Sequence, residues 1–260
     1  MKKKYPTKTV YYKSFSEDFD GGDMKARPIG RDYKYVREGK LDSFLRFIHY
    51  RLFATPLAFF YRLFVGRERF VGKEKLSAVG NRGFFLYCNH TQAAADAFIP
   101  NLAVFPRRGY TVVSSKNFSV PVFGRSLHYY GALPVPTELS ALRNFKAAIS
   151  RRIEERGVVI IYPEGHLWPY ATSLRPFGDE SFTYPVSLGA PSFAFTRVYR
   201  ATRRGFRSEI YIDGPFYPTE GLSASEARAH LAARVRAAME ERCALSDIEI
   251  IRYVKKEEEV

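Results

Sequence analysis

The amino-acid sequence predicts a single α/β domain with a mixed, mostly parallel sheet flanked by helices, plus an N-terminal amphipathic helical segment. Three observations support this prediction. From residue 67 onward, short apolar runs typical of strands alternate with segments of helical period. One run, Val158-Val-Ile-Ile-Tyr162, is apolar throughout, as strands buried on both faces of a parallel sheet are. The chain has 260 residues, 46% of them hydrophobic, which suits one large core.

Changes in composition divide the chain into four parts. They are a polar extension, an amphipathic helical segment, the α/β domain and a C-terminal tail, at residues 1–40, 41–66, 67–245 and 246–260. The extension lacks a clear period, and we expect it to lie loosely on the domain. Its opening Met-Lys-Lys-Lys is followed by no apolar run, so we expect no secretory signal. The mixed-charge end of the tail, residues 255–260, is expected to fray.

Residues 41–64 have an amphipathic helical pattern. Apolar residues form one stripe at helical spacing, at Leu41, Leu45, Ile48, Leu52, Phe59 and Leu63. We expect Pro56 to kink this helix or to split it in two. Additional aromatic residues and arginines suit a helix lying in a membrane interface, and an ordinary core helix whose arginines reach solvent is the alternative. The longest uncharged apolar stretch, residues 52–61, falls well short of the ~20 residues that a membrane-spanning helix needs.

The later elements follow in chain order. Strands are expected at residues 67–72, 83–88, 110–115, 131–135, 158–162, 184–188, 193–199 and 208–213. A helix is expected to begin with Thr137 as its cap and to end at Gly157. The last helix opens with the capping box Ser223-Ala-Ser-Glu226. Its buried stripe is expected at Leu231, Val235 and Met239.

Charge and cysteine content restrict the classes of partner. Lys and Arg total 41 against 27 acidic residues, a formal net charge of +14. This surplus indicates an anionic partner, namely nucleic acid, an acidic membrane surface or phosphorylated small molecules. The basic residues are dispersed and match no nucleic-acid-binding motif, which argues against nucleic acid. Cys88 and Cys243 lie far apart and in no metal-ligand pattern, so we expect a reduced, cytoplasmic protein without a bound metal.

Residues 83–96 hold the candidate catalytic pair. An apolar strand ends just before His90, and an alanine-rich helix is expected over residues 91–98. A histidine at such a junction is well placed for proton transfer, because the junction also offers free backbone N–H groups. Asp96 is the only acidic residue between positions 74 and 138, so it is the expected partner of His90. A capping or core histidine with an exposed Asp96 is the alternative that these residues alone leave open.

Further motifs accompany this pair in a fixed order. They are Phe70-Val-Gly-Lys-Glu-Lys-Leu76, Asn89-His90 with Asp96, Pro121-Val-Phe-Gly124, Gly131-Ala-Leu-Pro-Val135, Tyr162-Pro-Glu-Gly165 and, where a proline-bearing strand is expected, Tyr184-Pro-Val186. Over roughly residues 70–212 the chain therefore resembles the glycerolipid acyltransferase family, which includes the lysophosphatidic acid acyltransferases. The resemblance implies a peripheral O-acyltransferase that meets a lysolipid acceptor at an anionic membrane surface.

The resemblance also implies a mechanism. His90 would be the general base for the acceptor hydroxyl, and Asp96 would orient its ring. Backbone N–H groups at the start of the following helix would hold the oxyanion. The acyl donor would be acyl-CoA or acyl-carrier protein, used as a co-substrate, and no cofactor is implied. Cys88 is more readily explained as a buried, inert thiol than as a nucleophile.

The remaining site residues are assigned by resemblance as substrate-binding. Glu164 and Gly165 would belong to the acceptor pocket, and His166 is either a further pocket residue or a solvated one. Lys116 and Arg125 could meet phosphates of the acceptor or of the donor's nucleotide, or be solvated charges. Arg175 could replace a phosphate-binding arginine that the family usually carries.

Three departures from the family pattern bear on activity and acceptor. Five residues separate His90 from Asp96 instead of the usual four, so a wider loop must absorb the extra one or the pair is broken. The arginine expected after the Gly-Ala-Leu block is absent, and His166-Leu167 stands where Thr-Arg is common. Arg125, His128, Arg143 and Arg175 are the possible replacements. A catalytically silent lipid-binding relative and an enzyme for a non-phosphate acceptor, such as an amine lipid, are therefore the alternatives.

Overall fold

The computed structural model describes residues 5–19, 25–121 and 123–256. Its main sheet has seven strands in the order β2-β8-β7-β3-β6-β4-β5. They are β2 (Arg69–Val71), β3 (Phe84–Cys88), β4 (Gly109–Val113), β5 (Ala132–Pro134), β6 (Val158–Ile161), β7 (Ser192–Thr202) and β8 (Gly205–Phe216). The five strands from β7 to β5 are parallel, β8 is antiparallel to β7, and β2 pairs parallel to β8. The predicted mixed, mostly parallel α/β sheet is confirmed.

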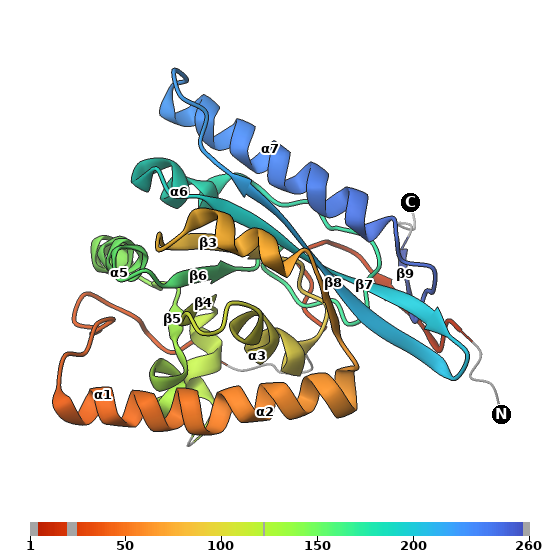
Figure 1. The fold of residues 1–260 in the computed structure, drawn as a ribbon, viewed down its shortest axis with the longest axis horizontal. Coiled ribbons are helices and arrows are strands. Elements are labelled where there is room, and N and C mark those ends of the chain that lie inside the picture. Colours follow the sequence, from red (N-terminus) through yellow and green to blue (C-terminus); the bar gives the residue numbers. More distant parts are fainter. Residues whose placement is uncertain (1–4, 20–24, 122, 257–260) are drawn as a thin grey trace.

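Helices cover both faces of this sheet (Figure 1). The α-helices after the N-terminal segment are α3 (Ala93–Ala103), α4 (Phe123–Ser126), α5 (Leu142–Glu154), α6 (Thr183–Leu188) and α7 (Ala224–Cys243). Short 3₁₀ segments lie at Lys73–Val79, Ser115–Ser119, Leu127–Tyr130, Leu139–Ala141 and Glu180–Phe182. Side chains of β3 and β6 alternate between the faces, so that Phe85 packs with α5 and α7 while Phe84 packs with α3. The central strands are therefore buried on both sides, as their apolar sequences predict.

The predicted amphipathic helix is present but is not split. It runs as α1 (Lys40–Phe47), the π-helical η1 (Ile48–Ala54), α2 (Thr55–Phe60) and the π-helical η2 (Tyr61–Gly66). Pro56 lies in the first turn of α2, just after the π-helical η1 ends. Ala54 and Thr55, at this junction, both keep right-handed helical dihedral angles. The missing proline N–H therefore changes the helix type instead of breaking the rod.

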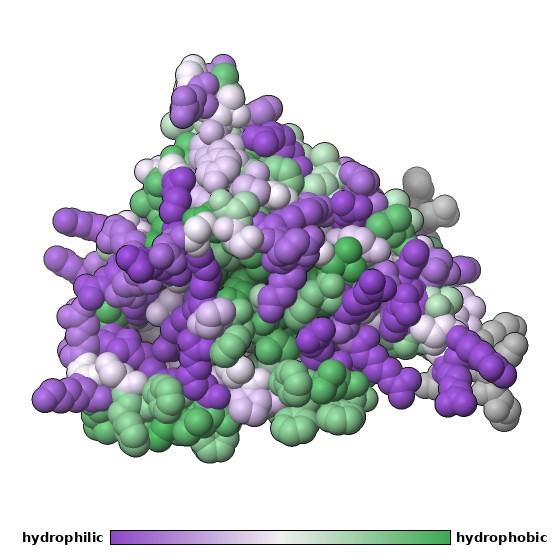
Figure 2. Space-filling model, in the orientation of Figure 1, coloured by the Kyte–Doolittle hydropathy of each residue, from purple (hydrophilic) through white to green (hydrophobic). Residues whose placement is uncertain are grey.

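This helix buries a different face from the one its apolar stripe indicates. Tyr50, Ala54 and Ala58, spaced four residues apart, are its buried side chains. Most large apolar side chains of the segment are exposed instead, by 46% to 70%, at Leu41, Phe44, Phe47, Leu52, Phe53, Leu57, Phe59, Phe60, Leu63, Phe64 and Val65. Hydrophobic side chains gather along the lower edge of the molecule in Figure 2, where this helix lies, and form a border there. We call this border the aromatic edge. In the part of the chain that the structure describes, no helix is long and apolar enough to cross a membrane.

The extension and the tail are more ordered than the sequence indicates. β1 (Lys8–Tyr12) pairs in parallel with β9 (Ile251–Lys255) in a separate two-stranded sheet. Ile29 and Tyr35 are buried in the main core. The expectations of a loose extension and of a tail that frays from residue 255 are therefore wrong for residues 5–19, 25–40 and 255. Residues 1–4, 20–24 and 257–260 lie outside the described residues.

Two local predictions fail for identifiable reasons. Residues 184–188 form helix α6, not a strand, because Pro185 fits a first helical turn and Gly189 ends the helix with φ +55°. Thr137 does not cap α5, since its Oγ1 accepts the backbone N–H of Ile29 at 2.8 Å. The capping box at Ser223 is confirmed, as is the burial of Leu231, Val235 and Met239 in α7.

Candidate active site

The junction between β3 and α3 brings His90 and Asp96 together. The His90 Nδ1 lies 2.8 Å from Asp96 Oδ2. Helix α3 begins only at Ala93, so the extra residue of the motif lengthens the loop before the helix. The backbone N–H groups of Thr91 and Gln92 both donate to Asp96 Oδ2 at 2.9 Å. The Asp96 carboxylate therefore holds the loop and the imidazole at once.

This contact leaves one imidazole nitrogen free for chemistry. When Nδ1–H donates to Asp96, the lone pair of His90 Nε2 is available as a base. Among the described residues, Nε2 has no hydrogen-bond partner. The His90 side chain is 23% exposed whereas that of Asp96 is 4% exposed. The pair thus presents its basic nitrogen outward and keeps its carboxylate in the interior.

A buried arginine on β7 supports Asp96 from behind. The Arg197 guanidinium contacts Asp96 Oδ1 at 3.4 Å and also forms an ion pair with Glu68. Its backbone is fixed by the side chain of Asn89, which accepts the Arg197 N–H at 2.8 Å and donates to its carbonyl at 2.9 Å. Burial disfavours the charged guanidinium, but Glu68 and Asp96 outweigh this effect and raise the pKa of Arg197. The arginine is therefore a fixed positive charge beside the pair.

Sequence reasoning missed Arg197. Its signal was a single charged residue within the apolar run of residues 192–199, where a buried strand was already expected. Glu68 carried no comparable signal, because it lies in the charged stretch Arg67-Glu-Arg69 just before β2.

Tyr162 and the loop after β6 form a wall beside the imidazole. The Tyr162 ring centroid lies 4.4 Å from that of His90, and its hydroxyl donates to the Asp96 carbonyl at 2.6 Å. The loop is joined to the His90 segment by the Trp168 N–H, which donates to the His90 carbonyl at 3.2 Å. Burial raises the pKa of Tyr162 well above its ordinary value, so its phenol stays protonated.

Glu164 and Arg175 occupy buried positions behind His90. Glu164 Oε2 accepts the backbone N–H of His90 at 2.7 Å, and Oε1 accepts that of Arg175 at 2.9 Å. The Arg175 guanidinium is 3.0 Å from Oε2, and the two side chains are only 3% and 1% exposed. Neither residue lines the cavity at His90. The Glu164 carboxylate is occupied by the protein itself, so this geometry gives no support to the expectation that Glu164 faces the acceptor.

A cavity of about 480 Å³ opens beside His90, at the carboxyl ends of β4 and β6. Apolar side chains provide much of its wall, at Ala93, Ala97, Val112, Val113, Val135, Pro136, Ile161 and Leu167. Polar groups line the rest, at Asp18, Thr111, Ser114, Ser115, Asn117 and Tyr162. Among the described residues no Lys or Arg lines it, and Asp18 and Asp96 are its acidic groups. It suits an acyl chain better than a phosphate.

The other predicted binding residues are dispersed around this cavity. Gly165 lines it, whereas His166 lies beside it with Nδ1 3.3 Å from Asp18 Oδ2. Lys116 is exposed on the turn next to the lining residues but does not line the cavity itself. Arg125 is exposed in a separate hollow of about 510 Å³ that also contains Arg27. The structure thus brings one of these four residues, Gly165, into the cavity wall.

Neither Cys88 nor a metal cluster competes for the chemistry in the part of the chain described. Cys88 is fully buried, and burial raises the pKa of its thiol well above the ordinary value. No group of three or more His, Cys, Asp and Glu residues there is arranged to hold a metal ion. His90 and Asp96, together with Asp18 and Tyr162, are the titratable residues that line the cavity.

Comparison with known proteins identifies the family. A family model described as Acyltransferase matches residues 67–196, half of the chain. The chain belongs to the acyltransferase family. The acyltransferase match includes His90, Asp96 and Glu164 and ends one residue before Arg197. The assignment made from the ordered motifs is confirmed.

Two further comparisons complete this result. The acyltransferase is similar to the crystal structure of the 1-acyl-sn-glycerophosphate (LPA) acyltransferase PlsC from Thermotoga maritima, with a TM-score of 0.49 and 16% sequence identity. The similarity covers 78% of this chain and 95% of that chain. A search of curated protein sequences gives no match.

Proposed function

We propose that this acyltransferase moves a fatty acyl group from the thioester of acyl-CoA or acyl-carrier protein to a hydroxyl of a glycerolipid-type acceptor. The observation that carries the proposal is the 2.8 Å contact between His90 Nδ1 and Asp96 Oδ2 at a mainly apolar cavity. The intact contact favours an active enzyme over a silent lipid-binding relative. The five-residue spacing does not break the pair.

In the proposed reaction His90 is the general base. Its Nε2 takes the acceptor's hydroxyl proton as the oxygen attacks the thioester carbonyl, and a tetrahedral intermediate forms. Asp96 stabilises the resulting imidazolium. The intermediate then collapses to the ester, and the thiolate leaves and recovers the proton from Nε2. A positioned base of this kind contributes roughly 10²–10⁴-fold in rate.

The oxyanion of the intermediate needs hydrogen-bond donors. The N–H groups of Thr91 and Gln92 are already engaged by Asp96. Ala93 is the first residue of α3 and also lines the cavity. We therefore assign the oxyanion to the N–H groups of the first turn of α3, where the helix dipole also favours negative charge.

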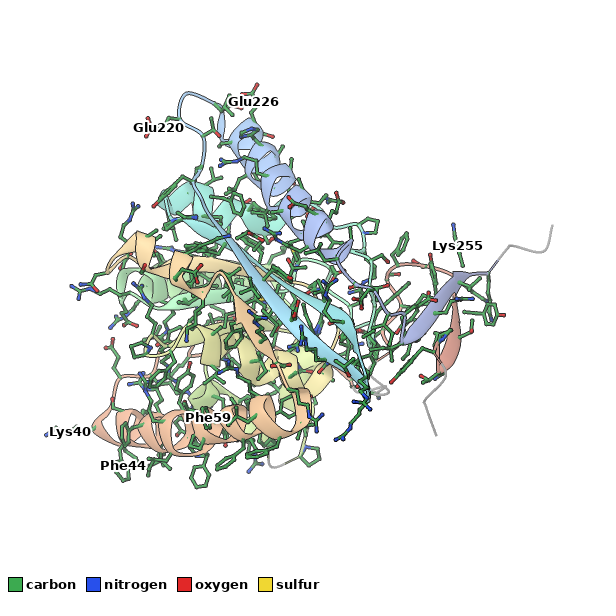
Figure 3. All side chains as sticks on the ribbon, turned by 45° about the vertical axis from the view of Figure 1, so that its right-hand side comes forward. Lys40, Phe44, Phe59, Glu220, Glu226 and Lys255 are labelled. Carbon is green, nitrogen blue, oxygen red and sulfur yellow. The ribbon has the colours of Figure 1, made fainter. Side chains whose placement is uncertain are left out.

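We propose that the aromatic edge lies in the interface of an anionic membrane, with the enzyme peripherally associated. Phe44 projects from the helix away from the sheet in Figure 3. The helix that carries the edge contacts the loop after His90, because the hydroxyl of Tyr61 donates to the side chain of Gln92 at 3.2 Å. The net charge of +14 would add attraction to acidic lipids.

The acceptor has two candidates. A lysophospholipid is the first, in line with the resemblance and with the membrane placement. An amine-bearing lipid is the second, and it is favoured by Asp18, whose carboxylate lines the cavity where the described residues place no Lys or Arg. A phosphate bound inside this cavity would lack a cationic partner there.

Thiol release from acyl-CoA and from acyl-carrier protein tests the proposal, with lysophospholipid, glycerol-3-phosphate and amine-lipid acceptors compared side by side. We expect acceptor-dependent release by the native enzyme and loss of it in His90→Ala. His230→Ala is a matched control, because His230 is an exposed residue of α7 that does not line the cavity at His90. Unchanged turnover in His90→Ala would exclude His90 as the base.

A further inference from the structure

A second cavity, of about 360 Å³, lies under the aromatic edge and contains a cluster of arginines. Its lining residues are Ser43, Arg46, Phe47, Tyr50, Arg51, Arg108, Tyr110, Arg152 and Glu155. Two of the arginines come from the helix of residues 40–66, and two come from the α/β domain. The cavity shares no lining residue with the cavity at His90. It is therefore a separate site, for which the proposed acyl transfer has no use.

The two domain arginines are held in place by aromatic faces and backbone contacts. The Arg108 guanidinium lies 4.8 Å from the Tyr50 ring centroid and 5.2 Å from that of Tyr110. The Arg152 guanidinium lies 4.6 Å from the Tyr110 centroid. Arg108 also donates to the Tyr129 carbonyl at 2.9 Å. These contacts orient the guanidinium groups before any ligand arrives.

Positive charge in this cavity is not balanced by the protein. Four arginines face one carboxylate, Glu155, which bonds Arg152 at 2.7 Å and also pairs with Arg151 outside the lining. Arg152 is only 5% exposed. The buried Nε atoms of Arg108 and Arg152 have no hydrogen-bond partner among the described residues. Glu155 compensates the buried Arg152, so the excess positive charge lies on the half-buried Arg46, Arg51 and Arg108, and an anion in the cavity would balance it.

The pKa of Arg108 agrees with this geometry. Burial lowers it, and the neighbouring charges of Arg46 and Arg152 lower it further against the opposing influence of Tyr110 and Tyr50. Neighbouring cations that repel one another across a cavity attract an anion placed between them.

We propose that this arginine cavity binds a phosphate group, either the headgroup phosphate of an anionic phospholipid or free phosphate. Guanidinium forks match phosphate oxygens in pairs, and one phosphate offers more oxygens to a cluster of arginines than one carboxylate does. Phe47 lines the cavity and belongs to the exposed aromatic edge, so a lipid that inserts beside it can place its phosphate among the arginines. Binding would fix the helix of residues 40–66 to both the lipid and the domain.

Lysine substitutions test the site, because they keep the charge but remove the paired hydrogen bonds. Arg46→Lys and Arg51→Lys change half-buried lining residues, and Arg67→Lys changes an exposed arginine at the end of the same helix that lies outside the cavity. Each full-length protein is titrated with inorganic phosphate at constant ionic strength. Each is also titrated with phosphatidylcholine vesicles, with and without phosphatidylglycerol.

We expect Arg46→Lys and Arg51→Lys each to weaken phosphate or phosphatidylglycerol-vesicle binding about tenfold, the loss of one charge-assisted hydrogen bond. Arg67→Lys should bind as the native protein does. Binding of inorganic phosphate alone would identify free phosphate as a ligand, and binding only to phosphatidylglycerol vesicles would identify a lipid headgroup.

Equal binding by all three variants and the native protein would overturn the proposal, because the attraction would then depend on charge alone. No binding in either arm would overturn it as well. Thioester turnover is measured separately with a soluble acceptor, so a failure of this site is distinguishable from a failure of the proposed acyl transfer. Thermal unfolding in chloride buffer verifies that each variant is folded.

Discussion

Arg197 provides the sharpest test of how the catalytic pair is supported. Arg197→Met keeps a long, unbranched side chain that can fill much of the same space. It removes the positive charge between two buried carboxylates, Glu68 and Asp96. Breaking a buried ion pair by removing one partner destabilises a protein by about 3–5 kcal/mol. We expect a loss of this size in the free energy of unfolding at neutral pH.

The loss of unfolding free energy in Arg197→Met should be smaller at low pH than at high pH. Burial raises the pKa of Glu68 in the folded chain, with Arg197 acting in the opposite direction. Removing Arg197 raises this pKa further. A carboxyl group with a higher pKa folded than unfolded binds more protons in the folded state, so its contribution to stability falls as pH rises above about 4.3. Arg197→Met should therefore be less destabilised near pH 5 than at pH 8.

Urea unfolding at the two pH values, with kcat measured in parallel, tests this reasoning. The double variant Arg197→Met/Glu68→Leu is the control, because removing both partners should recover part of the lost stability. Arg197→Lys should retain more of kcat than Arg197→Met, since it keeps a positive charge behind Asp96. Equal stability of Arg197→Met and the native enzyme at both pH values would refute the assigned network.

Three further predictions follow from the site and the aromatic edge. Glu164→Gln should lower the free energy of unfolding by about 3 kcal/mol, because it leaves buried Arg175 unpaired, while KM for the acceptor stays unchanged; a large rise in KM would return Glu164 to the pocket. Alkylating reagents should leave Cys88 and the activity of the native enzyme intact, as measured by mass spectrometry and thiol release; rapid modification of Cys88 would contradict its burial. Phe44→Ser should weaken binding to anionic vesicles about tenfold, the effect of burying one phenylalanine, without changing thermal unfolding; equal vesicle binding would remove Phe44 from the membrane contact.

The parts of the fold that the sequence predicted are those set by nearby residues. The apolar run of β6 and the capping box of α7 are local signals, and both elements form where expected. The motif order located His90 and Asp96 for the same reason. Only five residues lie between His90 and Asp96, so the sequence itself limits how far apart they can lie.

The parts that escaped prediction depend on partners distant in the chain. Arg197 reaches Asp96 across 101 positions and Glu68 across 129. The Thr7 hydroxyl that begins the β1–β9 pairing donates to Ile250, 243 positions away. No local pattern marks such contacts. The helical stripe of large apolar residues indicated the wrong buried face for residues 41–64. The buried side chains are Tyr50 and two small residues, Ala54 and Ala58, where α2 packs closely against α3.

The extra residue between His90 and Asp96 also affects how the Asp96 carboxylate is held. Because the helix starts after Gln92, Asp96 lies in its first turn, and one carboxylate oxygen receives the loop's two N–H groups together with the imidazole. Its other oxygen faces Arg197. The orientation of His90 is therefore fixed by a carboxylate that is itself held from both sides. The charge of Arg197 is part of this arrangement, because its guanidinium holds the carboxylate that orients the imidazole.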